Sequence, residues 1–139
     1  MTYLDSSGDQ LLAAFEAGAI GPADFPHERH VRVAWLCARA YGRDVGLARL
    51  EAGIRRIACE AGRPEAFHVT ITRAWFELIE AADDLDEHED LFDKTLLGRY
   101  YSPGRLDAGR EHWVEPDLRP LRLPPPRLRP VDCAAADVA

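Results

Sequence analysis

Apolar side chains recur every three or four positions along most of the first hundred residues, which is the spacing of one face of an α-helix. The clearest run has Leu47, Leu50, Ile54, Ile57 and Ala61 on a single face. Glycine and proline interrupt the runs, and both residues are typical of helix ends. The pattern predicts an all-α protein whose helices cover about residues 9–18, 24–41, 44–61, 65–82 and 83–98, with a short sixth helix over residues 102–113.

Two of the predicted connections are short. They centre on Gly42-Arg43 and on Gly62-Arg63-Pro64. Short connections favour antiparallel neighbouring helices. We therefore expect an up-and-down helical bundle of about five helices over residues 1–118, with aromatic side chains in its core: Trp35, Trp75 and Phe76.

The C-terminal part of the chain has a different character. Proline is frequent from Pro116 onward, and proline cannot continue a helix. We expect residues 119–139 to form an extended or disordered Pro/Arg-rich arm that adds little to the stability of the monomer past about Pro124. Such an arm can also dock on another subunit, so a homo-oligomer is one of the expected states.

Charge and hydropathy exclude several classes of partner. The chain has 17 Lys and Arg against 24 Asp and Glu, a formal net charge of -7, whereas nucleic-acid binding needs clustered basic side chains. No apolar run approaches the roughly 20 residues of a membrane-spanning helix. The N-terminus lacks the basic-then-apolar pattern of a secretory signal, so we expect a cytoplasmic protein. Its three cysteines are then reduced thiols: Cys37, Cys59 and Cys133.

The most distinctive chemistry lies in three histidines. At about 100° per residue, His27 and His30 share a helix face with apolar residues such as Val31. His68 shares its face with Trp75 in the same way. Because the two helices that carry them are expected to run parallel, their first turns lie at the same end of the bundle. We therefore predict that His27, His30 and His68 converge on one point.

Three converging imidazoles are typical of a catalytic metal centre. Neutral histidines supply nitrogen ligands to Zn, Fe, Cu or Ni, and three protein ligands leave a coordination position open. The hydroxyl of Thr72, or a carboxylate from Glu65 or Glu28, can support the site. The leading hypothesis is a small helical-bundle metalloprotein, and one form of it is a mononuclear enzyme acting on a small polar or anionic substrate.

Two other hypotheses stand beside the metal centre. The same histidines can form a metal-free pocket that binds a small molecule or transfers protons. The protein can instead be a partner-binding module. The sequence does not distinguish these classes. Histidines outside the group, His88 and His112, are interpreted as surface residues, and the acidic stretch from Asp83 to Asp93 as a solvated face.

Two blocks of the sequence resemble an uncharacterised group of small all-helical bacterial proteins. The first block leads from His27 to Trp35 and has the pattern HxxHxxxAW, and the second, from Phe67 to Thr72, has the pattern (Y/F)HxTxT. The resemblance extends over about residues 15–120 and implies a helical fold without implying an activity. The chain departs from the group at Val69, where the group often has Glu.

Overall fold

The computed structural model describes residues 2–125, and the side chains from Gly8 onward. This part of the chain is helical and contains no strand, which confirms the all-α class. The α-helices are α1 (Thr2–Glu16), α2 (His27–Glu60), α3 (Val69–Glu80) and α4 (Pro103–Ala108). The short 3-10 helices are η1 (Pro22–Asp24), η2 (Pro64–Ala66), η3 (Leu85–Glu87), η4 (Glu89–Phe92) and η5 (Leu96–Arg99).

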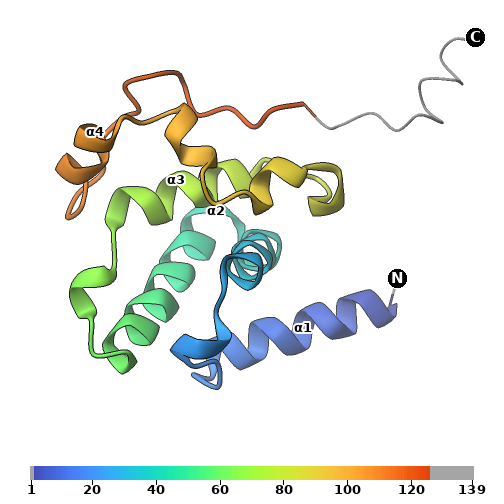
Figure 1. Ribbon diagram of the computed structural model, residues 1–139. Coiled ribbons are helices and arrows are strands. Elements are labelled where there is room, and N and C mark those ends of the chain that lie inside the picture. The colour runs from blue at the N-terminus through green and yellow to red at the C-terminus, as the bar shows by residue number, and fades with distance from the viewer. Residues whose placement is uncertain (1, 126–139) are drawn as a thin grey trace, which may run out of the picture.

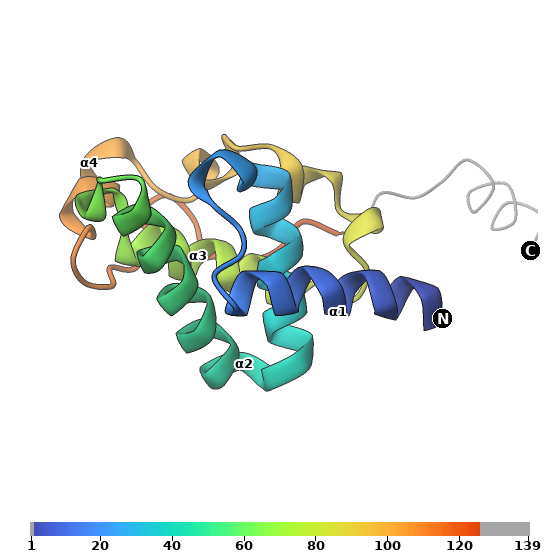
Figure 2. The ribbon, with the colours of Figure 1, turned by 90° about the horizontal axis from the view of Figure 1, so that it is seen from below.

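The central element is α2, which packs against α1 on one side and against α3 on the other (Figures 1 and 2). Two separate helices were predicted here, over residues 24–41 and 44–61. The chain instead runs as one helix with a sharp kink at Gly42, whose φ of 82° and ψ of -173° suit glycine almost exclusively. The kink replaces the predicted antiparallel turn, so the two halves of α2 meet at an angle in Figure 2.

The core forms where the apolar stripes of these helices meet. Trp75 and Phe76 of α3 are buried as predicted, while Trp35 is partly buried and donates its indole N–H to the Ala82 carbonyl at 2.8 Å. Phe15 of α1 packs over Gly53 of α2, and any side chain at position 53 would overlap the Phe15 ring. No helix in the described residues is long and apolar enough to span a membrane.

The segment after α3 is not the single helix predicted over residues 83–98. It consists of η3, η4 and η5, which lead back along α3 so that α4 lies near the beginning of that helix (Figure 1). Buried Leu91 lies six positions after Leu85 and five before Leu96, so a continuous α-helix would turn it about 120–140° away from both of these buried leucines. α4 likewise ends at Ala108, short of the predicted Trp113.

The first part of the C-terminal arm packs on the helices. Tyr100 accepts at its carbonyl from the Leu118 amide at 2.9 Å, and its hydroxyl donates to the Arg122 carbonyl at 2.7 Å. Leu121 and Leu123 lie against the core. Packing therefore continues past residue 118, where we predicted that the bundle ends. The predictions for the arm after Pro125, including Cys133 and its reduced thiol, lie outside the described residues.

Candidate functional site

His68 has a structural role at the beginning of α3. Its Nδ1 accepts a hydrogen bond from the amide of Ile71 at 3.1 Å, and its Nε2 lies 2.9 Å from the carbonyl of Leu106. An amide can only donate and a carbonyl can only accept, so Nε2 carries the proton and Nδ1 does not. Burial, the largest influence, lowers the pKa of His68. Both nitrogens are occupied by the fold itself.

The other amides of this helix terminus that have no partner within the helix donate hydrogen bonds to a distant segment. The amide of Val69 donates to the carbonyl of Arg110 at 2.8 Å, and the amide of Thr70 donates to the carbonyl of Gly109 at 3.1 Å. The first amides of an α-helix have no partner within the helix. We call residues 109–114 the capping segment, because together with His68 they supply those partners.

Thr70 fixes the capping segment from the side. Its fully buried hydroxyl donates to the His112 carbonyl at 3.0 Å and accepts from the Val114 amide at 3.1 Å. Thr72 is also buried, but its hydroxyl forms no hydrogen bond with the described residues. The HxTxT block therefore holds α3 to a segment about forty positions further along the chain.

His27 lies at the first position of α2. Its Nε2 donates to the carbonyl of Leu91 at 2.9 Å, which leaves Nδ1 for another partner. Its ring meets the edge of Trp75, with the two ring centres 4.7 Å apart. The pKa of Asp93 is lowered, mainly by hydrogen bonds from Thr95, and His27 makes the smallest contribution to this lowering. This corner of the molecule therefore combines an imidazole, an indole and a carboxylate.

His30 is beside His27, with their ring centres 6.2 Å apart. Phe25 packs edge-on against the His30 ring at 5.6 Å. Burial, with a smaller contribution from His27, lowers the pKa of His30 to about 4. The His30 ring forms no hydrogen bond with any described residue. It is thus an unprotonated and unpaired imidazole at neutral pH.

The structure brings His27 and His30 together but does not bring His68 to them. His27 meets Trp75, which lies seven positions after His68, or about 10 Å further along α3. The first turns of α2 and α3 are therefore not aligned as expected, because the first turn of α2 meets α3 at Trp75 and not at His68. The described residues accordingly contain no group of three or more His, Cys, Asp or Glu side chains arranged around one ion.

The supporting residues lie in different places. Glu28 is exposed and pairs with Arg32 at 3.4 Å. Glu65 is exposed in η2, pairs with Arg63 at 3.8 Å, and is outside α3, which begins four residues later than predicted. Thr72 is buried one turn after His68. Neither glutamate is placed to complete a site with His27 and His30.

One histidine was misinterpreted from the sequence. His88 was predicted on the surface with His112, and only His112 is exposed. His88 has 8% of its surface exposed and lies between the buried side chains Leu85 and Leu91. Its spacing of three from each leucine was the available signal, because a 3-10 helix has three residues per turn and places all three on one side.

Comparison of the chain with known protein families, with curated proteins and with solved structures finds no match. The resemblance to small bacterial proteins therefore stays a prediction that rests on the two sequence blocks. In this fold the second block supplies a helix cap through His68 and Thr70, while the first block places His27 and His30 side by side. The histidine pair is the candidate functional site.

Proposed function

We propose that the protein binds a small polar or anionic molecule at the N-terminal end of α2, through His27 and His30. The observation that carries the proposal is the unpaired ring of His30 beside His27. A neutral imidazole has one donor and one acceptor nitrogen, and both nitrogens of the partly buried His30 ring are open to a partner. Nδ1 of His27 is an acceptor, because Nε2 carries the proton, so a ligand that donates to it and accepts from the N–H of His30 would bond to both rings.

The end of α2 offers hydrogen-bond donors to a ligand. α2 begins after Pro26 without a side-chain cap, so its first amides are free to donate, while Glu28 in the first turn offsets part of the positive helix dipole. A hollow of about 470 Å³ lies beside the same turn; Asp24, Glu28, Arg29 and Arg32 are part of its wall, and neither His27 nor His30 lines it. Because Glu28 pairs with Arg32, the charged groups of this wall without an ion-pair partner among the described residues are Arg29 and Asp24.

Hydrogen bonding fits this site better than proton transfer. A general base works best when its pKa is near the working pH. With a pKa of about 4, His30 would be protonated in roughly one molecule in a thousand at pH 7. Its value to a ligand is therefore a neutral nitrogen in a fixed place, and we propose binding rather than acid/base catalysis.

A metal-binding form of this function is the second candidate. It is favoured by the closeness of the two imidazoles, because unprotonated nitrogen binds Zn, Fe, Cu or Ni. His27 and His30 would supply two ligands, and water or a bound molecule would complete the coordination, because the described residues place no third ligand side chain beside them. Metal analysis of protein purified without chelator or nickel resin distinguishes this form, since the metal-free form predicts no stoichiometric metal.

The binding proposal is tested by NMR of the histidine rings. Inorganic phosphate, oxalate and malonate would each be titrated into the full chain at neutral pH, with the ring signals of all five histidines followed separately. We expect at least one anion to shift His27 and His30 saturably while His68, whose nitrogens are occupied, serves as the internal control.

Matched variants complete this test. His30→Gln should weaken the anion-dependent shift of His27, and His112→Gln, at an exposed position, should leave that shift unchanged. If none of the three anions shifts His27 or His30, or if all histidines shift alike, the proposed site is wrong.

A further inference from the structure

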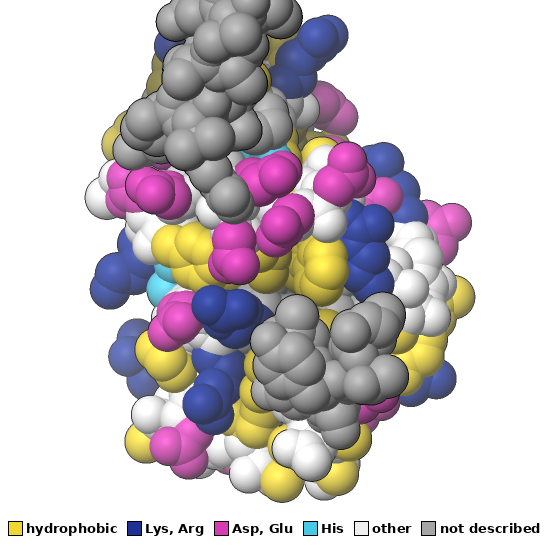
Figure 3. Space-filling view, turned by 90° about the vertical axis from the view of Figure 1, so that its right-hand side faces the viewer, with side chains coloured by type: hydrophobic (Ala, Val, Ile, Leu, Met, Phe, Trp, Pro, Cys, Tyr) yellow, Lys and Arg dark blue, Asp and Glu magenta, His cyan; other side chains and the backbone are white. Residues whose placement is uncertain are grey.

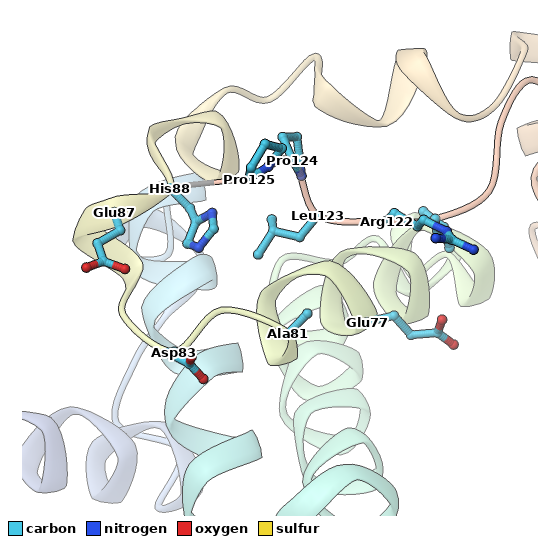
Figure 4. A pocket seen from close by; sticks show the side chains of 10 residues that line it. Glu77, Ala81, Asp83, Glu87, His88, Arg122, Leu123, Pro124 and Pro125 are labelled. Carbon is cyan, nitrogen blue, oxygen red and sulfur yellow. The ribbon is translucent and has the colours of Figure 1, made fainter. Parts of the chain in front are cut away.

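A second hollow lies at the C-terminal end of α3, whereas the capping segment lies at its N-terminal end. It has a volume of about 540 Å³, within the usual range of small-molecule pockets. The end of α3 and the η3 turn form one wall, and the arm forms the other, with Leu123, Pro124 and Pro125 (Figure 4). One wall is thus rich in polar groups and the other is apolar.

His88 is directed into this hollow (Figure 4). Its side chain is more than nine-tenths buried, and its ring forms no hydrogen bond or ion pair with the described residues. No fully buried side-chain nitrogen or oxygen in the described residues lacks a partner, so the unpaired His88 nitrogens are accessible, and the hollow that His88 lines is the space in front of them. A largely buried imidazole that lines a cavity without a hydrogen bond indicates a site for a polar partner.

The charges around the hollow favour a cation. Glu77 is already paired with Arg73 at 2.8 Å and Arg43 at 3.3 Å. Glu87 lies beside His88 and forms no ion pair with the described residues. Figure 3 shows this side of the molecule, where acidic side chains gather next to exposed apolar surface.

The remaining charged groups do not reverse this preference. Asp83, at the rim, is 4.0 Å from Arg39 and fully exposed. Arg122 also contributes to the wall, but its guanidinium is directed away from His88 and lies beside Glu77 (Figure 4). The end of the hollow that contains His88 therefore has a free carboxylate and no free guanidinium.

We propose that this hollow binds a small organic cation, an amine that carries an apolar group. The ammonium would donate to the Glu87 carboxylate and to the acceptor nitrogen of His88, because an ammonium supplies only donors and both of these groups accept. The apolar group would lie against Leu123 and Pro124. This site is independent of His27 and His30 and does not rest on the function proposed for them.

Three probes of similar shape test the proposal on the full chain at neutral pH: benzylammonium, benzyl alcohol and benzoate. Each is titrated while the ring signals of His88 and His30 are followed by NMR. We expect benzylammonium to bind more tightly than either of the others and to shift His88 without shifting His30. Equal binding of all three probes would show an apolar surface without a cation site, and tighter binding of benzoate would contradict the proposal.

Variants identify the contacts. Glu87→Gln should weaken benzylammonium binding roughly two- to fivefold, the effect of one exposed charge, whereas Asp86→Asn, a neighbouring carboxylate outside the hollow, should change it little. His88→Leu should weaken it roughly tenfold, the effect of one hydrogen bond to a charged group. Circular dichroism establishes that each variant folds. Binding that is unaffected by both Glu87→Gln and His88→Leu would overturn the assignment.

Discussion

Thr70 provides a direct test of the capping segment. Thr70→Val keeps the shape of the side chain and removes the hydroxyl that bonds to the His112 carbonyl and the Val114 amide. Thr70 is fully buried, so water cannot replace the lost partner without opening the segment. Leaving a buried donor or acceptor unsatisfied costs about 1–3 kcal/mol. For the two groups together we expect a loss of roughly 2–4 kcal/mol in the free energy of unfolding.

Urea unfolding followed by circular dichroism measures this loss. With about 3 °C of melting temperature per kcal/mol for a chain of this size, Tm should fall by roughly 6–12 °C. Hydrogen exchange adds local information, because the Val114 amide should exchange faster in the variant. The Ile71 amide, which is bonded to His68, should be affected less.

Thr72→Val is the matched control. Thr72 belongs to the same block and is buried, but its hydroxyl has no hydrogen-bond partner among the described residues. Its replacement should change the free energy of unfolding by less than about 1 kcal/mol, in line with a shape-conserving change that breaks no bond. Equal losses for both valine variants would refute the role that we give to Thr70.

Three further outcomes follow from the structure. Burial lowers the pKa of His30 to about 4, so the unfolded chain binds more protons than the folded chain between pH 6.5 and 4. The free energy of unfolding should therefore fall by roughly 3 kcal/mol as the pH is lowered from 6.5 to 4. In urea unfolding measured from pH 7.5 to 4, His30→Gln should show a smaller decrease of the midpoint than the unchanged protein. Gly42→Ala should cost about 1–3 kcal/mol in urea unfolding, because the kink has a φ of 82°, and an unchanged midpoint would contradict this backbone requirement. Gly53→Ala should lower Tm through overlap with the Phe15 ring, whereas Gly104→Ala, which meets open space, should not; similar Tm values for the two variants would contradict the packing.

The sequence predicted what local periodicity determines. The apolar face of α3 and the burial of Trp75 and Phe76 follow from residues three and four positions apart, and the helical class follows from the same signal. The beginning of α3 was misplaced because its cap is a histidine, outside the set of Ser, Thr, Asp and Asn that usually identifies a helix start. Its other partners come from the capping segment, which no local pattern relates to α3.

The candidate site was predicted only in part for a similar reason. The adjacency of His27 and His30 is local, because they are one turn apart on α2. The position of His68 depends on how α3 crosses α2 and on the kink at Gly42, and the sequence gives neither angle. The free ring of His88 depends on the arm, whose packing at Leu123 has no helical period to reveal it.

The capping segment also influences the order of folding. Its bonds to Val69 and Thr70 join residues 39 to 44 positions apart, so they close a long loop, while α2 and α3 each form through neighbours. At about 5–20 residues per second, a ribosome needs roughly 2–9 s to extend the chain from Thr70 to Val114. The amides of Val69 and Thr70 lack their acceptors until residues 109 and 110 have been made, and the emergence of Val114 allows the last bond of the capping segment to form.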